Sequence, residues 1–211
     1  MLKKIYSFVR NFRNNFKMQF VRKDIAKHCT LVGDSHGFRL NSKVGLKHGS
    51  TPEDIVLHDH CEVFGVINSY NHGKVVMSPW SKLGPDSEIS CANHIEIGRD
   101  TAIAFGVTII DHNTHPINPE DRRYMRHTPH RSEERSPKYA ASAPIIIGEN
   151  VWIGSNARIQ KGVNIGDNAI IAANSVVTKD VPANAIAAGN PAKIVKEHID
   201  ETTTPVFPLK K

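Results

Sequence analysis

An aliphatic residue recurs at every sixth position between residues 147 and 177, without an exception. The series consists of Ile147, Ile153, Ile159, Ile165, Ile171 and Val177. An α-helix repeats every 3.6 residues and a single strand every two, so neither explains this period. A coil with three short flat faces needs about six residues for each face. The period therefore predicts an all-β chain that folds as a parallel β-helix.

Two further positions of the repeat agree with this prediction. The fourth residue after each aliphatic one is small or β-branched, as a narrow interior requires: Val151, Ala157, Val163, Ala169, Ser175 and Val181. The third is always Gly, Asn or Asp: Asn150, Asn156, Gly162, Asn168, Asn174 and Asp180. These residues enter the left-handed backbone region most readily, and a corner between two faces needs that conformation. The three patterns together predict two full coils.

The repeat extends upstream with a change of phase. One run holds Ile97, Ile103 and Ile109, with corner positions at Asp100, Gly106 and His112. An earlier run holds Met77, Leu83 and Ile89, again six apart. Because Ile89 and Ile97 are eight apart, we expect two extra residues in one turn. The pattern leaves the start of the coil open within residues 31–75.

A long insertion, residues 112–144, separates the two well-phased runs. It is rich in Pro, His and Arg and has no period. A loop of this length inside a repeat array is usually functional or disordered. The coil domain with this insertion is expected over residues 28–195, followed by a C-terminal tail over 196–211.

The N-terminal segment, residues 1–27, holds eight Lys or Arg and one acidic residue, whereas the whole chain has a formal net charge of +6. The positive charge therefore belongs to this segment and does not indicate a nucleic-acid-binding face on the coil. Apolar residues at spacings of three and four predict a basic amphipathic helix: Leu2, Ile5, Val9, Phe12, Phe16 and Phe20. Two interpretations stay open. The helix packs on the coil end or a neighbouring subunit, or residues 1–25 lie on an anionic membrane.

Cys29, Cys61 and Cys91 are odd in number and form no CxxC pair. This spacing argues against disulfides and against a thiolate zinc site. The sequence holds no run of 18 apolar residues and no signal-peptide core. We therefore expect a cytoplasmic protein, with peripheral attachment at the inner membrane face as the alternative.

Four stretches carry a family resemblance: THPINP (114–119), IGENVWIGSNARI (147–159), GVNIGDNAIIAANSVVTKDVP (162–182) and AGNPAKIV (188–195). They resemble the hexapeptide-repeat acyltransferases, in particular the maltose and galactoside O-acetyltransferases and the capsule and colanic-acid acetyltransferases. The resemblance covers about half of the chain. It implies a left-handed parallel β-helix, a homotrimer with active sites between neighbouring coils, and acetyl-CoA as the donor.

The resemblance implies that His115, in the THPI stretch, is the general base. It would take a proton from the acceptor hydroxyl while that oxygen attacks the thioester. An imidazole, with an unperturbed pKa of about 6.5, suits this role. His112 stays open as the alternative base, because this chain has one residue more than the sugar acetyltransferases between Ile109 and the THPI histidine.

The resemblance also implies a donor groove along Ser155, Ala173, Thr178 and Lys179, which would hold the pantetheine arm and the adenosine phosphates. Lys196 stands where some relatives carry Arg and would contact phosphate as a point charge. For each lysine, a solvated surface charge is the alternative.

Trp152 occupies an outward-facing position of the repeat, where an uncovered indole is unfavourable. We expect it against the ligand or a neighbouring subunit.

The leading interpretation is an acetyl-CoA-dependent O-acetyltransferase that modifies a sugar hydroxyl in capsule or surface-polysaccharide synthesis. The insertion would then be a lid over the acceptor, whose arginines recognise a pyrophosphate or else pair with nearby acidic residues.

Three alternatives stay open. One is an N-acetyltransferase of an amino sugar or antibiotic. A second is a zinc enzyme like the gamma-type carbonic anhydrases, through His94, His112 and His115. A third is a non-enzymatic scaffold. Under the leading interpretation we expect no metal and no nucleic-acid partner.

Overall fold

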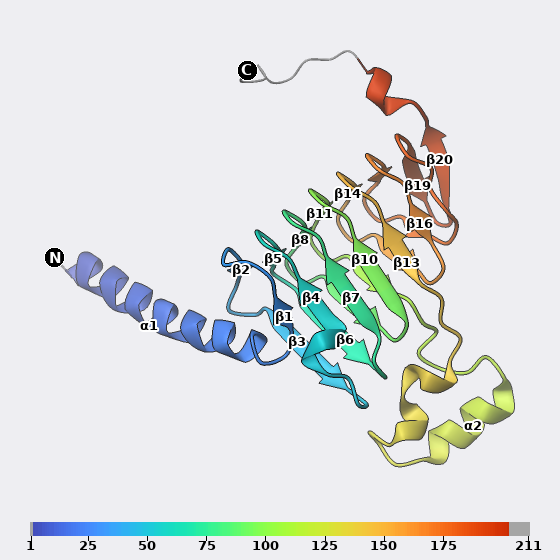
Figure 1. Ribbon diagram of the computed structural model, residues 1–211, viewed down its shortest axis with the longest axis horizontal. Coiled ribbons are helices and arrows are strands. Elements are labelled where there is room, and N and C mark those ends of the chain that lie inside the picture. The colour runs from blue at the N-terminus through green and yellow to red at the C-terminus, as the bar shows by residue number, and fades with distance from the viewer. Residues whose placement is uncertain (1, 203–211) are drawn as a thin grey trace.

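The computed structural model describes the backbone of residues 2–202 and the side chains from residue 14 onward (Figure 1). Between Thr30 and Lys196, short strands form the three faces of one coil. Every strand pairing is parallel except the last, between β19 and β20. The predicted parallel β-helix is therefore confirmed.

Each face of the coil is one sheet, here called A, B and C. Sheet A contains β1 (Thr30–Leu31), β4 (Ile55–Leu57), β7 (Lys74–Met77), β10 (His94–Ile97), β13 (Ile145–Ile147) and β16 (Asn164–Ile165). Sheet B contains β2 (Gly37–Phe38), β5 (Glu62–Val63), β8 (Lys82–Leu83), β11 (Ala102–Ile103), β14 (Trp152–Ile153), β17 (Ile170–Ile171), β19 (Ile186–Gly189) and β20 (Ala192–Lys196). Sheet C contains β3 (Lys43–Lys47), β6 (Val66–Tyr70), β9 (Glu88–Cys91), β12 (Thr108–Ile110), β15 (Arg158–Gln160) and β18 (Val176–Val177).

Within residues 2–202, two α-helices lie outside the coil, α1 (Leu2–Ile25) and α2 (Pro119–His127). The same residues include four single 3₁₀ turns: η1 (Pro52–Asp54), η2 (Glu133–Arg135), η3 (Pro137–Tyr139) and η4 (Ile199–Glu201).

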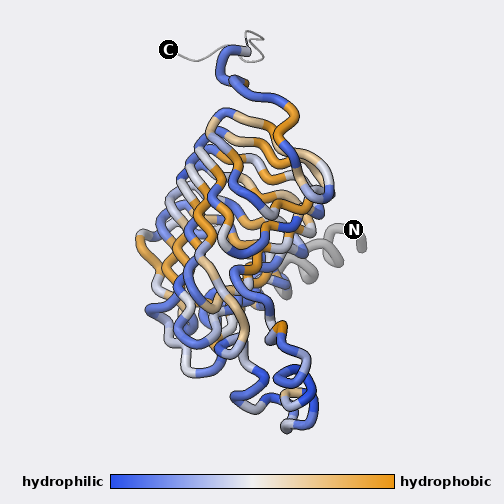
Figure 2. Tube along the Cα trace, turned by 90° about the vertical axis from the view of Figure 1, so that its right-hand side faces the viewer, coloured by the Kyte–Doolittle hydropathy of each residue, from blue (hydrophilic) through white to orange (hydrophobic). Residues whose placement is uncertain are grey.

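The aliphatic series forms the core of the coil. All six members are at most 2% exposed, and equivalent residues stack in register; Ile153, for example, lies between Ile103 and Ile171. The six small or β-branched positions are buried too, as predicted. Figure 2 shows the hydrophobic segments repeating from coil to coil. Each buried Ile or Val contributes roughly 1.5–3 kcal/mol relative to an exposed one, so every added coil stabilises its neighbours.

The corner prediction is confirmed at seven positions and wrong at two. The seven have φ between 52° and 76°: Asp100, Gly106, Asn150, Asn156, Gly162, Asn168 and Asn174. Asp180 and His112 do not adopt positive φ. The Asp180 carboxylate instead accepts the Asn164 N–H at 2.7 Å, and His112 lies where the chain leaves the coil.

The coils differ in length as the eight-residue spacing predicted. Ile89 pairs with Ile109, twenty residues later, whereas Ile147 pairs with Ile165, eighteen residues later. The coil begins at β1, so its start at Thr30 lies one residue before the expected range.

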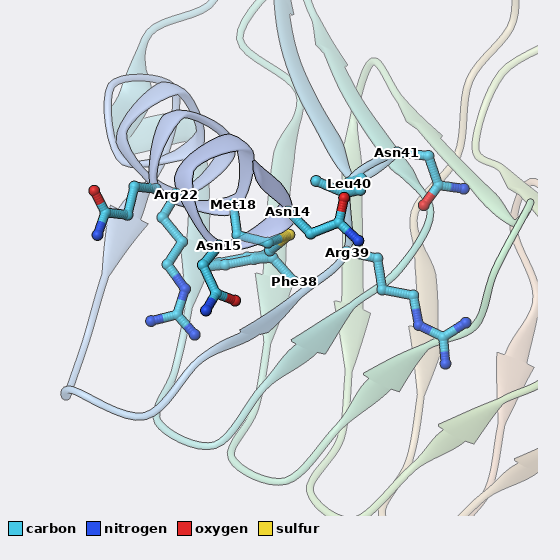
Figure 3. A pocket seen from close by; sticks show the side chains of 9 residues that line it. Asn14, Asn15, Met18, Arg22, Phe38, Arg39, Leu40 and Asn41 are labelled. Atoms are coloured by element: carbon cyan, nitrogen blue, oxygen red, sulfur yellow. The ribbon is translucent and has the colours of Figure 1, made fainter. Parts of the chain in front are cut away.

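Among the residues whose side chains are described, those in the C-terminal half of helix α1 meet the first coils, and the helix projects away from the end of the coil (Figure 1). Ile25 is 1% exposed, Val21 packs beside it, and Met18 approaches Phe38 across the groove between α1 and β2 (Figure 3). These three residues, at spacings of three and four, form a second apolar face of the helix.

The part of the predicted apolar stripe of α1 that the structure describes faces solvent and not the coil. Its two described side chains, Phe16 and Phe20, are 56% and 59% exposed and touch each other edge to face, with ring centroids 4.9 Å apart. Packing of the stripe on the coil end is therefore wrong for these two residues. The side chains of Leu2, Ile5, Val9 and Phe12 lie outside the described part of the chain.

The C-terminal end of the coil is covered by a hairpin. Strand β20 folds back antiparallel on β19, and η4 follows it. Residues 203–211 of the expected tail lie outside the described residues. Within residues 2–202, none of the helices combines the length and the apolar character that a membrane span requires.

Candidate functional site

The insertion leaves and re-enters the coil through a narrow neck. His112 and Ser142 form an antiparallel bridge. On either side of this bridge, the Asn113 N–H donates to the Ala141 carbonyl and the Ala143 N–H to the Asp111 carbonyl, both at 2.9 Å. The neck follows β12 of sheet C and precedes β13 of sheet A, so residues 113–141 project from the C–A edge of the coil (Figure 1).

Asp111 attaches this neck to the preceding coil. Its side chain is fully buried, and its carboxylate accepts the N–H groups of Ala92 and Asn93, each at 2.8 Å, and the Cys91 thiol at 3.1 Å. A buried carboxylate requires such donors, because desolvation disfavours its charge. The sequence analysis missed Asp111, since nothing in a six-residue period marks a partner twenty residues upstream.

His112 is held in one tautomer within the neck. It is 6% exposed, and its Nδ1 accepts the Thr114 N–H at 3.0 Å. The neutral ring therefore carries its proton on Nε2, which donates to the Ser90 hydroxyl at 3.0 Å. Burial lowers the pKa of His112, against the opposing effect of the Asp111 and Glu88 carboxylates. Both ring nitrogens are thus occupied, which is the arrangement of a structural histidine.

His115 has the opposite surroundings. It is exposed, and neither of its ring nitrogens has a hydrogen-bond partner among the described residues. It follows Thr114, whose φ of 66° reverses the chain, and its N–H donates to the Asn113 carbonyl at 2.7 Å. Its side chain lines a cavity of about 220 Å³ together with Arg122, Met125, Arg126 and Arg135.

Helix α2 is the element of the insertion that the sequence analysis missed. Asn118 caps it by accepting the N–H groups of Glu120 at 2.8 Å and Asp121 at 3.4 Å, and Pro119 occupies the first turn. An Asn–Pro pair followed by two acidic residues is a recognisable helix start, because it satisfies free N–H groups and complements the helix dipole. The helix brings Arg122 and Arg126, one turn apart, to the side of His115.

The sequence analysis expected the basic residues of the insertion either to recognise a pyrophosphate or to pair with nearby acidic residues. The structure shows such pairing for one of them and backbone hydrogen bonds for another. Lys138 pairs with Glu133 at 2.7 Å, as the solvated-loop interpretation expected. Arg135 instead donates from Nε to the Thr128 carbonyl at 3.1 Å and from its terminal nitrogen to the Arg126 carbonyl at 2.8 Å. Figure 2 shows the projecting insertion as mostly hydrophilic.

The predicted donor residues fall on two different edges of the coil. Thr178 and Lys179 are exposed on the C–A edge, two coils beyond the neck, which corresponds to roughly 10 Å along the coil axis. Ser155 and Ala173 stack in successive coils on the B–C edge, where the Asn174 N–H donates to the Ser155 carbonyl at 2.8 Å.

Trp152 lies on the outer face of sheet B, 57% exposed, in register between Ala102 and Ile170. Lys196 ends β20 and is exposed. One chain therefore brings His115, Thr178 and Lys179 to one edge and leaves Ser155, Ala173 and Trp152 elsewhere.

Cys29, Cys61 and Cys91 are free and buried. Burial raises the pKa of the Cys29 thiol to about 12 and raises the pKa of Cys61 and Cys91 as well. Such thiols are poor nucleophiles at neutral pH.

The three histidines of the zinc alternative are engaged differently from one another: His94 lies 3.6 Å from the Glu96 carboxylate, and His112 is held as described above. Within residues 2–202, no group of three or more His, Cys, Asp or Glu is arranged to hold a metal ion.

Comparison with known proteins agrees with this architecture. Residues 144–179 match the family model described as the hexapeptide repeat of succinyl-transferase. Galactoside O-acetyltransferase of Escherichia coli K12 is 40% identical over 119 residues, which are 54% of this chain and 59% of that protein. The putative lipopolysaccharide biosynthesis O-acetyl transferase WbbJ of the same organism is 33% identical over 136 residues, 64% of this chain and 67% of that protein.

A solved structure extends the likeness over most of the coil. AntD, an N-acyltransferase from Bacillus cereus in complex with dTDP and 3-hydroxybutyryl-CoA, superimposes with a TM-score of 0.63 over 85% of this chain and 87% of that one, at 17% identity. The chain belongs to the hexapeptide-repeat acyltransferases, a family of enzymes with a left-handed β-helix. It spans about three fifths of the galactoside O-acetyltransferase.

Proposed function

We propose that this protein is an acetyl-CoA-dependent O-acetyltransferase that modifies a sugar hydroxyl. The observation that carries the proposal is the contrast between two histidines: His112 is buried with both ring nitrogens hydrogen-bonded, whereas His115 is exposed and its ring nitrogens have no partner among the described residues. The relatives named as O-acetyltransferases support the reaction class.

His115 would act as the general base. It accepts the proton of the acceptor hydroxyl while the oxygen attacks the thioester carbonyl carbon. The tetrahedral intermediate then collapses, the C–S bond breaks, and the imidazolium returns its proton to the departing CoA thiolate. No acyl-enzyme is needed, since the thioester is already activated, and the buried cysteines fit a direct transfer.

The residues predicted to bind the acyl donor suit acetyl-CoA, which has a thin pantetheine arm and several phosphates. Ser155 and Ala173 have short side chains at an edge of the coil, which leaves the backbone open to a pantetheine arm. Lys179 is exposed and forms no ion pair with a described residue, so it is free to meet a phosphate. The CoA complex of AntD supports an acyl-CoA donor in this fold.

A homotrimer would complete the site. The predicted residues lie on two edges of a three-sided coil, the C–A edge and the B–C edge. Packing the C–A edge of one copy beside the B–C edge of the next would join the two half-sites. Three-fold closure repeats this contact three times. The exposed Trp152 would be covered at such an interface or by the ligand.

Helix α1 would place the enzyme at a membrane. Its segment carries eight basic residues and one acidic residue, and Phe16 and Phe20 remain exposed. A basic amphipathic helix of this kind binds anionic lipid. We propose a cytoplasmic enzyme attached at the inner face, where it would modify capsule or surface-polysaccharide precursors.

Replacing His115 tests the function directly. Thiol release from acetyl-CoA is measured with neutral sugars, charged sugars and amino sugars as acceptors. We expect His115→Ala to lower kcat by about 10²–10⁴ without loss of folding. Turnover near that of the parent protein would refute the assignment. Acetylation of amino sugars alone would favour the N-acyl alternative, which the N-acyltransferase AntD keeps open.

A further inference from the structure

Three arginines surround the proposed base. Arg122 and Arg126 from α2 and Arg135 from η2 line the same cavity of about 220 Å³ as His115. The insertion also carries Arg123 and Arg131, which do not line it. The fold has therefore gathered three of five guanidinium groups around one imidazole.

These guanidinium groups are positioned but not neutralised. Arg135 is held by the carbonyls of Thr128 and Arg126, and Arg122 donates to the Ile117 carbonyl. The Arg126 side chain has no hydrogen-bond partner among the described residues. Within residues 2–202, no carboxylate forms an ion pair with any of the three.

Two acidic residues of the insertion line a different cavity. Asp121 and Glu134 line a second cavity, of about 500 Å³, together with Tyr124 and Tyr139. Met125 borders both cavities and separates them. Asp121 and Glu134 therefore do not line the cavity that holds His115 and the three arginines.

Such a cluster is unfavourable without a ligand. Arg122 and Arg126 are four residues apart on one helix face, where like charges repel. A bound anion would reverse this cost, because guanidinium groups bind carboxylate and phosphate oxygens with paired, charge-assisted hydrogen bonds.

We propose that this cavity binds an anionic group of the acceptor, so that the substrate is a sugar carrying a phosphate or a carboxylate. At about 220 Å³ the cavity is smaller than a ligand pocket of roughly 300–1,000 Å³, and it therefore suits the charged group and not the whole acceptor. Held there, the anion would orient a neighbouring hydroxyl toward His115. This inference rests on the proposed function, because it concerns the acceptor of the same reaction.

Arg126→Gln is the informative variant, because that side chain forms no hydrogen bond or ion pair with a described residue that the substitution would remove. Arg123→Gln is its matched control, on the same helix but outside the cavity. Rates of thiol release are measured for glucose, glucose 6-phosphate and glucuronic acid, at varied acetyl-CoA. Binding of glucose 6-phosphate without acetyl-CoA is measured separately by calorimetry.

We expect Arg126→Gln to raise the KM for the charged acceptors by about 10–100-fold, with little change in the KM for glucose or acetyl-CoA. Arg123→Gln should behave as the parent protein. A preference for glucose 6-phosphate over glucuronic acid would identify phosphate as the group bound, and the reverse order would identify carboxylate.

The possible failures are distinguishable. Efficient turnover of glucose with no effect of Arg126→Gln overturns the anion site and leaves the acetyltransferase intact. A raised KM for acetyl-CoA alone also overturns it, because the arginines would then serve the donor. If no acceptor supports thiol release but glucose 6-phosphate binds only when Arg126 is present, the proposed function fails and the anion site stands. Absence of both turnover and binding refutes both.

Discussion

The coil and the insertion of this chain follow different physical rules. In the coil, one buried aliphatic residue stacks on the next, and each corner repeats the same backbone conformation. In the insertion, residues 113–141 are held by individual contacts such as the Asn118 cap and the Arg135 bonds to the Thr128 and Arg126 carbonyls. The coil is therefore stabilised by one contact repeated many times, whereas the insertion depends on individual contacts.

The coil therefore provides most of the stability of the protein, and the insertion provides the proposed base. A buried Ile in the coil supports coils on both sides, so the core tolerates little change. The insertion buries Met125 apart from the main core and exposes His115. Substitutions in the coil should therefore lower the free energy of unfolding, whereas substitutions in the insertion should lower the rate of thiol release.

The largest expected difference is between two isoleucines. Ile153→Asp places an uncompensated carboxylate in a fully buried position and should abolish cooperative folding. Ile117→Asp, in the insertion and 77% exposed, should change the free energy of unfolding by at most about 0.5 kcal/mol. Urea unfolding followed by circular dichroism measures both, and a folded Ile153→Asp protein would contradict the role of the stacked core.

Removing the insertion should separate folding from activity. Residues 113–141 are replaced by two glycines, which can join the neck because His112 and Ser142 already pair. We expect the coil to keep a cooperative unfolding transition and thiol release to fall by at least about 10². Retained turnover would mean that the coil alone carries the site.

His112→Ala should weaken the fold more than the chemistry. It leaves the Thr114 N–H and the Ser90 hydroxyl without a partner in the neck, at a cost of about 1–3 kcal/mol in the free energy of unfolding. Its kcat should stay well above that of His115→Ala, whose stability should be unchanged. If the two variants exchange these properties, His112 is the base.

The corner residues should show a smaller effect. Asn174 has a φ of 60°, so Asn174→Val should cost about 1–2 kcal/mol in the free energy of unfolding. Asn174→Gly adopts the same conformation without strain and serves as the control. Equal stability of the two variants would argue against the left-handed corner as a source of coil stability.

The smallest expected effect is a pH dependence of stability from the neck. Because burial lowers the pKa of His112, the unfolded chain binds a proton below about pH 6.5 that the folded chain does not. Stability should therefore fall as pH decreases from about 6.5 toward the folded pKa, and His112→Asn should remove this contribution. Comparing unfolding free energies at about pH 7.5 and about pH 5.5 checks it; a slope that persists in the variant would assign it to another group.

Much of the coil could be predicted because its rule is local. The six-residue period correctly predicted the core, and the Gly, Asn or Asp positions correctly predicted seven corners. The corner prediction was wrong at Asp180 and His112 because the repeat does not determine the backbone conformation there. Asp180 accepts a hydrogen bond from Asn164, sixteen residues away, and His112 marks the departure of the chain from the coil.

The candidate site was only partly predictable. The THPI stretch led to the prediction that His115 is the base, but the sequence left His112 open as the alternative. Their different surroundings depend on Ser90, Asp111 and Ser142, which come together only through the stacked coils. The basic cavity was hidden too, since the start of α2 at Asn118 was overlooked in an aperiodic segment.

By itself, the sequence determined a three-sided coil with an aliphatic core, because each position of the repeat satisfies a requirement that its neighbours along the chain already set. Only the tertiary structure decided which histidine is free, which arginines surround it, and that the predicted donor residues lie on two separate edges. Those outcomes depend on contacts between residues far apart in the chain, and no short-range pattern specifies such contacts.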